Sequence, residues 1–344
     1  MTSSVSGPGQ TRLDALHEML ASHSLLGLWQ RQRGDNTVQP RLWRWSDVLP
    51  CLLEAGEVVE LGKMTARRVV AMVSPEAGQN TSPTMFMDFQ LVNPGEVAFA
   101  HRHTASAIRF IVQGHGAYTT TNGEQMIMEP GDLVTQPNWA WHGHTNETDE
   151  PAIWIDGLDV SLVQYLSAMF GEPYGEGQEM EPISKPDGYS SQRFGAVRAP
   201  TGLASETFPM HYKWADTERA LEAMVADEGD PYDGVLLEYT NPVTGGPTLP
   251  TLACQIQMLR PGESTRRHRH TGTTLYYTYK GAGVSQVGES GDALHWDERD
   301  TFMIPPWSWH QHQNRSKSEP AILFSMTDRP VLQALGLHRE EVEP

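Results

Sequence analysis

The sequence predicts an all-β protein with peripheral helices, in which two β-barrels follow each other along one chain. Three observations support this prediction. A set of motifs occurs twice, the stretches between the motifs are short β-branched or aromatic runs, and Gly and Pro residues separate those runs. Many short strands with such turns are typical of antiparallel barrels or sandwiches. The 344 residues are enough for two domains of ordinary size.

The duplication is visible as four pairs of motifs at an almost constant separation. The pairs are Phe89–Glu96 with Ile256–Glu263, His101–Thr104 with His268–Thr271, Gly114 and Gly116 with Gly281 and Gly283, and Pro137–His144 with Pro305–His312. The first three pairs are 167 residues apart and the fourth is 168 residues apart. One inserted residue across so long a set indicates an internal duplication.

Local patterns predict the secondary structure between these motifs. Strands are expected at Ala107–Val112 and Tyr276–Tyr279, which are both followed by a Gly-x-Gly turn. A Pro-Gly-Asp turn separates two further expected strands, Gln125–Met128 and Leu133–Thr135. Helical periodicity predicts helices mainly in three places, which are Leu13–Leu26, Ser161–Phe170 and Ala215–Ala226.

These elements divide the chain into four parts. Residues 171–200 are rich in Gly, Pro, Ser and Glu, which is typical of a connector between domains. In chain order we expect an N-terminal helical segment (1–60), a first barrel (61–170), a linker with a helical junction (171–227) and a second barrel (228–344).

Composition argues against several classes of function. The chain has 25 Lys and Arg residues against 43 Asp and Glu, a formal charge of −18, whereas nucleic acids and anionic membranes bind basic surfaces. Its two cysteines cannot form a disulfide framework or an all-thiolate metal site. No apolar run is long enough to span a bilayer, and the first ten residues lack the apolar core of a signal peptide. We therefore expect a soluble, cytoplasmic protein that binds neither nucleic acid nor membranes.

Eight of the fourteen histidines lie in the duplicated motifs. His101 and His103 share one face of an expected strand, and His142 can add a third imidazole from a neighbouring strand. Three neutral imidazoles suit Fe(II), Mn(II), Ni(II), Cu(II) or Zn(II) rather than Ca(II) or Mg(II). The alternative is that these are ordinary strand histidines, solvated or hydrogen-bonded, but the same pattern occurs in both repeats. The sequence therefore predicts a metal site in the first barrel.

The same motifs resemble those of a known family. A His-x-His pair with a later His is similar to the two motifs of the cupin superfamily, which implies two tandem double-stranded β-helix barrels, a bicupin. The segments His101–Val112 and Trp139–His142 resemble the bicupin gentisate 1,2-dioxygenase group, which includes salicylate and 1-hydroxy-2-naphthoate dioxygenases. Three further segments extend the resemblance over roughly residues 25–340, namely Leu42–Asp47, Ala66–Val69 and Pro242–Pro247.

The resemblance implies an Fe(II)-dependent dioxygenase of aromatic catabolism. Such an enzyme opens the ring between the carboxyl- and hydroxyl-bearing carbons and converts gentisate to maleylpyruvate. Many cupins have a glutamate ligand four or five residues after His-x-His, but Ala107 and Ile108 stand there in this chain. Three histidines leave coordination positions for O2 and for a small aromatic hydroxy acid. Gentisate is the expected substrate; the alternatives are salicylate, a 5-amino-, 5-nitro- or 5-halosalicylate, or 1-hydroxy-2-naphthoate.

The resemblance also implies roles for residues around the metal. Arg109 is expected to hold the substrate carboxylate, and His144 is expected to move a proton near the substrate hydroxyl group. Asp156 is expected to orient His144 or to anchor the site from behind. The remaining candidate substrate contacts are Gln90, Trp154, and Arg67 or Arg68, and the sequence does not distinguish between these two arginines.

Asp88 departs from the family pattern, because related enzymes carry a small residue at this position. Alternation along a strand gives Asp88 the same face as Gln90. A carboxylate beside an anionic ring repels it unless a specific hydrogen bond forms, so we expect Asp88 to contact a ring substituent such as a hydroxyl or amino group. The alternative is a bulged strand that leaves Asp88 solvated.

The second repeat keeps the histidines but changes the residues around them. His268, His270 and His310 retain the ligand pattern, and His312 matches His144, so metal binding in the second barrel stays open. Tyr276 and Ser325 replace Arg109 and Asp156. We therefore expect chemistry only in the first barrel and a structural role for the second.

Other classes of protein compete with this interpretation. Duplicated cupins also serve as storage or ligand-binding proteins, but a storage barrel has no use for an open metal site. Metal-dependent isomerases and manganese-dependent acid-forming enzymes are a third possibility, although they usually keep the glutamate that is missing here. Members of the dioxygenase group usually form oligomers, often tetramers, and exposed strand edges favour association between subunits. We therefore expect a homo-oligomer, specifically a tetramer.

Overall fold

The computed structural model of the chain describes residues 8–30, 38–195 and 208–343. It consists of two compact units, residues 1–36 and 37–344. The first unit contains helix α1 (Pro8–Ser22) and the short 3-10 helix η1 (Leu28–Gln30). Among the described helices, none is both long enough and apolar enough to cross a membrane.

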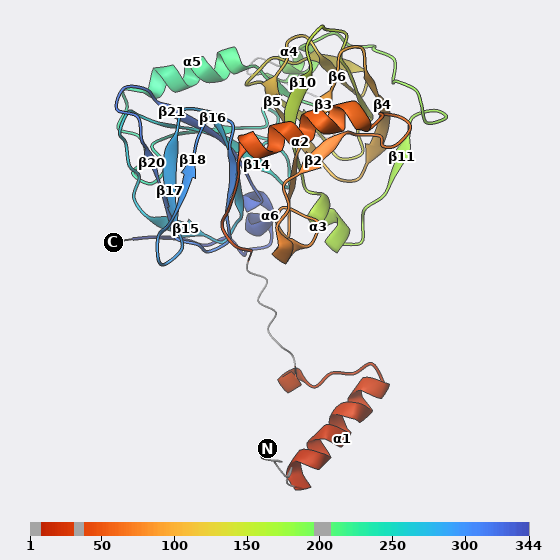
Figure 1. The fold of residues 1–344 in the computed structure, drawn as a ribbon, viewed down its shortest axis with the longest axis vertical. Helices are drawn as coiled ribbons and strands as arrows, with labels where there is room; N and C mark the ends of the chain where they lie inside the picture. Colours follow the sequence, from red (N-terminus) through yellow and green to blue (C-terminus); the bar gives the residue numbers. More distant parts are fainter. Residues whose placement is uncertain (1–7, 31–37, 196–207, 344) are drawn as a thin grey trace. The chain divides into compact units, whose positions relative to one another are not determined.

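The second unit contains two β-barrels that lie side by side (Figure 1). The strands of the first barrel are β2 (Val69–Ala71), β3 (Phe86–Val92), β4 (Val97–His103), β5 (Ala107–Gln113), β6 (Tyr118–Thr121), β7 (Glu124–Ile127), β8 (Leu133–Gln136), β9 (His142–Thr145), β10 (Ala152–Leu158), β11 (Gly171–Pro173) and β12 (His211–Tyr212). They form a large sheet, ordered β12-β8-β5-β10-β3-β2, and a small sheet, ordered β11-β4-β9-β6-β7.

The second barrel repeats this arrangement. Its strands are β1 (Arg41–Trp43), β13 (Val235–Tyr239), β14 (Ala253–Leu259), β15 (His268–His270), β16 (Thr274–Lys280), β17 (Gly283–Val287), β18 (Asp292–Trp296), β19 (Thr301–Ile304), β20 (His310–Asn314), β21 (Ala321–Thr327) and β22 (Glu340–Val342). The large sheet has the order β1-β19-β16-β21-β14-β13 and the small sheet the order β18-β17-β20-β15-β22. The predicted bicupin fold is confirmed.

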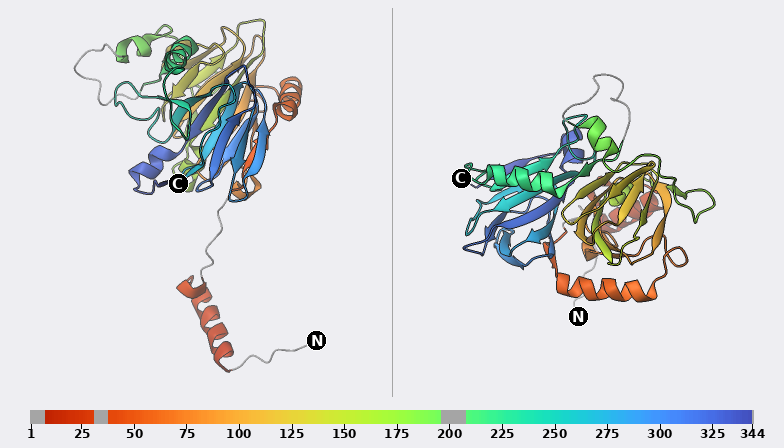
Figure 2. Two further views of the ribbon diagram at one scale, coloured as in Figure 1. Left: turned by 90° about the vertical axis from the view of Figure 1, so that its left-hand side faces the viewer. Right: turned by 90° about the horizontal axis from the view of Figure 1, so that it is seen from above.

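Short helices surround the barrels (Figure 2). They are α2 (Trp45–Val58), η2 (Pro75–Ala77), α3 (Val160–Tyr165), α4 (Tyr189–Phe194), α5 (Trp214–Met224) and α6 (Arg329–Ala334). Helix α2 packs on β2 and β3 and buries Val48 and Leu52, one helical turn apart. Helices α3 and α6 follow β10 and β21, so the duplication extends beyond the strands.

The large sheets of the two barrels pack against each other through the main hydrophobic core. The ring of Phe110 in β5 stacks on that of Phe324 in β21, with 4.2 Å between the centroids. Because side chains alternate along β5, Arg109 and Ile111 point the other way, into the first barrel. Ile111 and Trp154 belong to a separate apolar cluster there. The first barrel therefore has an apolar base and a polar region around Arg109.

Two reciprocal hydrogen bonds connect the barrels. The carboxylate of Asp159, after β10, accepts a hydrogen bond from Thr251 of the second barrel at 2.6 Å. The carboxylate of Asp328, after β21, accepts one from Thr84 of the first barrel, also at 2.6 Å. Equivalent residues of the two repeats thus make equivalent contacts across the interface.

The predicted strands are present, as β5, β16, β7 and β8, and the predicted helices are present as α1, α3 and α5. Helix α3 ends at Tyr165, earlier than the predicted Phe170, and α2 lies within the segment 1–60 that was expected to be helical, although its bounds were not predicted. The boundary between the two compact units, at residue 36, falls within the predicted N-terminal segment 1–60, and strand β1 of this segment pairs with β19 of the second barrel. Part of the predicted connector pairs as β11 with β4, whereas residues 196–207 lie outside the described part of the chain.

Candidate metal centre and substrate cavity

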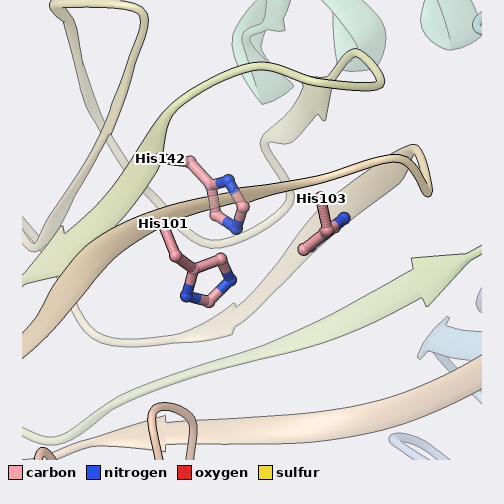
Figure 3. A group of neighbouring side chains, drawn as sticks. All are labelled: His101, His103 and His142. Carbon is pink, nitrogen blue, oxygen red and sulfur yellow. The ribbon is translucent and has the colours of Figure 1, made fainter. Parts of the chain in front are cut away.

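Three histidines from two neighbouring strands meet at the mouth of the first barrel. His101 and His103 lie on β4, and His142 begins β9, where it pairs directly with His101. One nitrogen atom from each ring lies within 4.8 Å of the others. Figure 3 shows the three rings pointing toward one another. This geometry confirms that the predicted triad can bind one metal ion.

The histidines are held in the form that binds metals. Burial lowers the pKa of His101 to about 2 and that of His103 to about 4, and it places the pKa of His142 well below its ordinary value. The imidazoles are therefore neutral at physiological pH. Nδ1 of His103 lies 2.9 Å from the carbonyl oxygen of Ala105, and Nδ1 of His142 lies 3.1 Å from that of Ala140. Donation from Nδ1–H to these carbonyls leaves Nε2 free as a ligand.

A cavity of about 690 Å³ opens in front of the triad. Its walls include the three histidines on the small sheet and Asp88, Gln90, Arg109 and Asp156 on the large sheet, with Arg67 at the edge. The volume is in the range of small-molecule sites. The structure therefore brings eight of the predicted site residues to one cavity.

Arg109 and Asp156 form a buried ion pair on the large sheet. The two residues are partners in the register of β5 and β10, and Nε of Arg109 lies 3.2 Å from Oδ1 of Asp156. Nη2 of Arg109 donates a hydrogen bond to Oε1 of Gln136 at 2.5 Å. The prediction that Asp156 orients His144 is wrong, because the other carboxylate oxygen of Asp156 accepts a hydrogen bond from Trp154 at 3.0 Å. Asp156 instead fixes the guanidinium group of Arg109.

Asp88 is buried, with 3% of its surface exposed, so it is not a solvated residue of a bulged strand. It lies on β3 opposite Asp156 on β10. Burial, together with the neighbouring Asp156, raises the pKa of the Asp88 carboxyl well above its ordinary value, although Arg109 acts in the opposite direction. Burial also raises the pKa of Asp156, again against the effect of Arg109. One arginine thus faces two carboxyl groups, and burial raises the pKa of both.

Several buried polar atoms of the cavity wall have no hydrogen-bond partner within the described ranges. They include Oδ1 of Asp88, Nε2 of Gln90 and Nη1 of Arg109. Leaving such a group unpaired costs about 1–3 kcal/mol. The wall is therefore suited to a ligand that carries both a carboxylate and another polar substituent.

The two candidate arginines have different environments. Arg67 lines the cavity and donates a hydrogen bond to the carbonyl oxygen of His142 at 3.2 Å. Burial and the nearby Arg109 lower the pKa of Arg67 to about 9. Arg68 instead forms two 2.7 Å hydrogen bonds with Glu96, away from the cavity. The prediction of a substrate contact is therefore corrected for Arg68, whose side chain leaves the backbone on the opposite side from that of its neighbour.

His144 and Trp154 lie behind the cavity wall rather than on it. Both are 1% exposed, and their ring centroids are 5.0 Å apart. The ring of His144 is 6.1 Å from that of His142, and its nitrogen atoms have no hydrogen-bond partner among the residues described. Neither residue is among those that line the cavity, and their expected contacts with substrate stay predictions. Trp154 belongs to the apolar cluster inside the barrel, and the ring of His144 lies against it.

Sequence reasoning missed Gln136, which positions Arg109. Its only sequence signal is its spacing from Val134, a residue of the apolar cluster inside the barrel, which gives both side chains the inward face of β8. Also missed were the apolar residues at the outer rim of the cavity, which are Phe86, Leu158, Val160 and Met169.

Comparisons with known proteins agree with this geometry. The cupin domain family matches residues 88–160 and 255–327. A 5-aminosalicylate 1,2-dioxygenase from Comamonas sp. is 42% identical over 347 residues, which cover 96% of this chain and 91% of the relative. A gentisate 1,2-dioxygenase from Aquipseudomonas alcaligenes is 36% identical, with 94% of each chain covered. The chain belongs to the gentisate and salicylate 1,2-dioxygenase family of bicupins.

A solved structure supports the assignment over the whole fold. Salicylate 1,2-dioxygenase from Pseudoaminobacter salicylatoxidans, as its adduct with gentisate, matches with a TM-score of 0.87 and 30% identity, over 100% of this chain and 97% of that one. The protein is thus a ring-cleaving 1,2-dioxygenase of aromatic catabolism with histidine triads able to bind a metal ion.

The second barrel of this bicupin dioxygenase has a triad without the surrounding site. His268, His270 and His310 also have ligand atoms within 4.8 Å of one another. Tyr276 and Ser325 are cross-strand partners there, at the position of the Arg109–Asp156 pair in the first barrel. The cavity beside this triad has a volume of only about 180 Å³. The two triads are therefore similar, but the first faces the larger cavity, and its wall contains the paired Arg109 and Asp156 where the second barrel has Tyr276 and Ser325.

Proposed function

We propose that the enzyme opens the ring of a salicylate that carries a hydrogen-bond donor at carbon 5, and that the reaction takes place in the first barrel. 5-Aminosalicylate is the first candidate substrate and gentisate, the 5-hydroxy compound, is the second. The observation that carries this proposal is the buried Asp88 carboxyl, whose Oδ1 has no partner in the described part of the chain and which shares a cavity with the triad and Arg109.

Different residues of the cavity would contact different groups of such a substrate. Nη1 of Arg109, which makes no hydrogen bond to a described residue, would donate to the substrate carboxylate. Asp156 and Gln136 keep the guanidinium group oriented for this contact. Nε2 of Gln90 is a further free donor in the same wall. These contacts hold the acid end of the ring at the triad.

His101, His103 and His142 would hold the metal, for which Fe(II) is the proposed ion. Fe(II) bound there would supply open coordination positions and the redox chemistry that O2 requires, while Arg109 and Gln90 hold the acid end of the substrate. The chain contributes neutral ligands for this purpose, and Arg67 supports them by its hydrogen bond to the carbonyl of His142. Cleavage between the carboxyl- and hydroxyl-bearing carbons would convert gentisate to maleylpyruvate.

Asp88 would select the substituent at carbon 5. Asp88 lines the cavity in front of the triad, in the same large-sheet wall as Arg109 and Gln90, so a ring held by these two residues has the Asp88 carboxyl beside it. A protonated or ionised carboxyl group accepts a hydrogen bond from an amino or hydroxyl substituent. A halogen or a nitro group offers no such donor. The 42% identity to a 5-aminosalicylate 1,2-dioxygenase favours the amino compound over gentisate.

Oxygen consumption by anaerobically Fe(II)-loaded protein tests this proposal. 5-Aminosalicylate, gentisate, salicylate, 5-chlorosalicylate and 1-hydroxy-2-naphthoate would be compared by kcat/KM, with ultraviolet detection of the opened ring. We expect the amino and hydroxy compounds to lead. A preference for salicylate or 5-chlorosalicylate would contradict the role of Asp88 but not the reaction type. No oxygen uptake with any of the five compounds would contradict the proposed reaction.

A further inference from the structure

Arg102 lies between the two ligand histidines of β4, and its side chain is held on three sides. The guanidinium carbon is 4.3 Å from the ring centroid of Trp139 and 4.3 Å from that of Trp141. Nε of Arg102 donates to Oε1 of Glu172 at 2.8 Å, and Nη2 contacts the same oxygen. We call these four residues, Arg102, Trp139, Trp141 and Glu172, the Arg102 clamp.

The second barrel contains the same arrangement around its own triad. Arg269, between His268 and His270, lies 4.5 Å from the ring centroids of both Trp307 and Trp309. Its Nε and Nη2 donate to Oε2 of Glu341 at 2.9 and 2.6 Å. The glutamates come from β11 and β22, which are added strands at the edges of the two small sheets. The clamp is thus retained in both repeats although the residues lining the cavities differ.

The clamp joins the segments that carry the ligands. The amide nitrogen of Trp139 donates to the carbonyl oxygen of His103 at 2.8 Å, and Ala140, the next residue, provides the carbonyl that holds Nδ1 of His142. Trp139 has a φ of 61°, in the left-handed region that a bulky residue rarely adopts. The equivalent Trp307 has a φ of 57°. The surrounding contacts therefore hold both loops in a conformation of higher energy.

One ligand depends on this support more than the others. His103 and His142 are fixed by hydrogen bonds from Nδ1 to backbone carbonyls, whereas the ring of His101 has no hydrogen bond to any residue in the described ranges. Its orientation follows from the conformation of β4, which is irregular between Ala98 and His101. Arg102, the next residue, attaches β4 at this point to β11 and to the loop before β9.

We propose that the Arg102 clamp is a positioning device that keeps His101, His103 and His142 in the geometry of a metal site. This inference rests on the proposed metal site and adds residues that do not touch metal or substrate. An exposed Arg–Glu pair alone contributes little to stability. A planar guanidinium group can stack on two indole rings and also donate two hydrogen bonds to a carboxylate. It therefore restricts the conformation of β4 more than a lysine would.

The test measures metal affinity rather than turnover. The background for all variants is a chain with His268→Ala and His270→Ala, in which only the first triad would bind Co(II). Competition with a chelator gives the Co(II) affinity, and the visible spectrum of bound Co(II) reports the coordination geometry. We expect Arg102→Ala to weaken Co(II) binding about ten- to a hundredfold and to change the spectrum. Arg102→Lys should recover only part of the affinity, and Glu172→Gln should give a smaller loss in a chain that keeps the stacking. Arg269→Ala, the matched control in the second barrel, should leave the affinity unchanged.

The outcomes separate the two proposals. Unchanged Co(II) affinity and spectrum in Arg102→Ala and Glu172→Gln would overturn the clamp even if the variants melt at a lower temperature. If Arg102→Ala does not fold, the Arg102→Lys and Glu172→Gln measurements decide. An absence of Co(II) binding in the parent chain would overturn the metal site itself, and the clamp with it.

Discussion

Nε of Arg109 lies 3.2 Å from Oδ1 of Asp156, and both side chains are almost completely buried. The register of β5 and β10 makes these residues direct partners, so the ion pair is built into the sheet. At the equivalent position of the second barrel, Tyr276 faces Ser325 and no charge is present. The two triads have similar geometry, so the barrels differ in the residues and the size of the cavity around the triad, and this ion pair is present only in the first.

Substitution of Arg109 should impair the reaction strongly. Arg109→Ala removes the donor to the substrate carboxylate and leaves Asp156 buried without its partner. We expect kcat/KM to fall ~30-fold or more, which corresponds to a loss of about 2 kcal/mol of transition-state stabilisation. Arg109→Lys keeps the charge but cannot contact Asp156, Gln136 and the substrate carboxylate at the same time, so it should retain intermediate activity. Steady-state kinetics with thermal melts as a folding control measure this. A folded Arg109→Ala enzyme within threefold of the parent would contradict the assignment.

Asp88 should determine the ranking of substrates. Asp88→Ala removes the acceptor for the substituent at carbon 5, so kcat/KM for 5-aminosalicylate and gentisate should fall about ten- to a hundredfold relative to that for salicylate, which corresponds to one lost hydrogen bond. Asp88→Asn is the matched control, because its amide oxygen still accepts a hydrogen bond. The same substrate panel gives the measurement. An unchanged ranking in Asp88→Ala would show that this carboxyl group does not contact the substituent.

The stability of the enzyme should depend on pH through His211, on β12. Nε2 of His211 lies 2.7 Å from Oδ2 of Asp132, and Nδ1 is 3.4 Å from Oδ1 of Asp187. Burial lowers the pKa of His211, but the contacts with Asp132 and Asp187 outweigh this effect and the repulsion from Lys213, so the net pKa is raised from its ordinary 6.5. A raised pKa means that the charged pair stabilises the fold below about pH 6.5 and that this contribution is lost as the pH rises through the folded-state pKa.

A comparison with His211→Gln isolates this contribution. Denaturant unfolding at about pH 6 and about pH 9 gives the free energy of unfolding of both proteins. The advantage of the parent over His211→Gln should be larger at the lower pH. An equal difference at both pH values would show that His211 has the same pKa in the folded and unfolded protein, which would contradict the raised pKa.

Much of this site was predictable because a duplication repeats its motifs. The two His-x-His pairs and the later histidines predicted both triads, and strand alternation placed Asp88 and Gln90 on one wall. The pairing of Asp156 with Arg109 was not predictable in the same way. It depends on which residues of β5 and β10 face each other, and the register shift between Ile153 and Trp154 is not visible in the sequence.

The other differences between the sequence predictions and the structure concern two adjacent arginines and a helix without clear boundary signals. Arg67 and Arg68 have the same chemistry, and only the structure shows that Glu96 binds one of them while the other reaches the cavity. Helix α2 contains Pro50 and has no side-chain cap at its N-terminus, so the usual boundary signals are absent. Its burial against β3, rather than local preference, stabilises it.

The central claim is that ring cleavage takes place at the first triad, and two matched double variants test it most directly. Oxygen uptake with 5-aminosalicylate and with gentisate would be measured for His101→Ala/His103→Ala and for His268→Ala/His270→Ala, both loaded with Fe(II) and checked for folding. We predict that the first variant loses activity completely and that the second keeps most of it, because only the first triad shares a cavity with Arg109 and Asp88. Activity that survives in the first variant, or that is abolished in the folded second variant, would contradict the account.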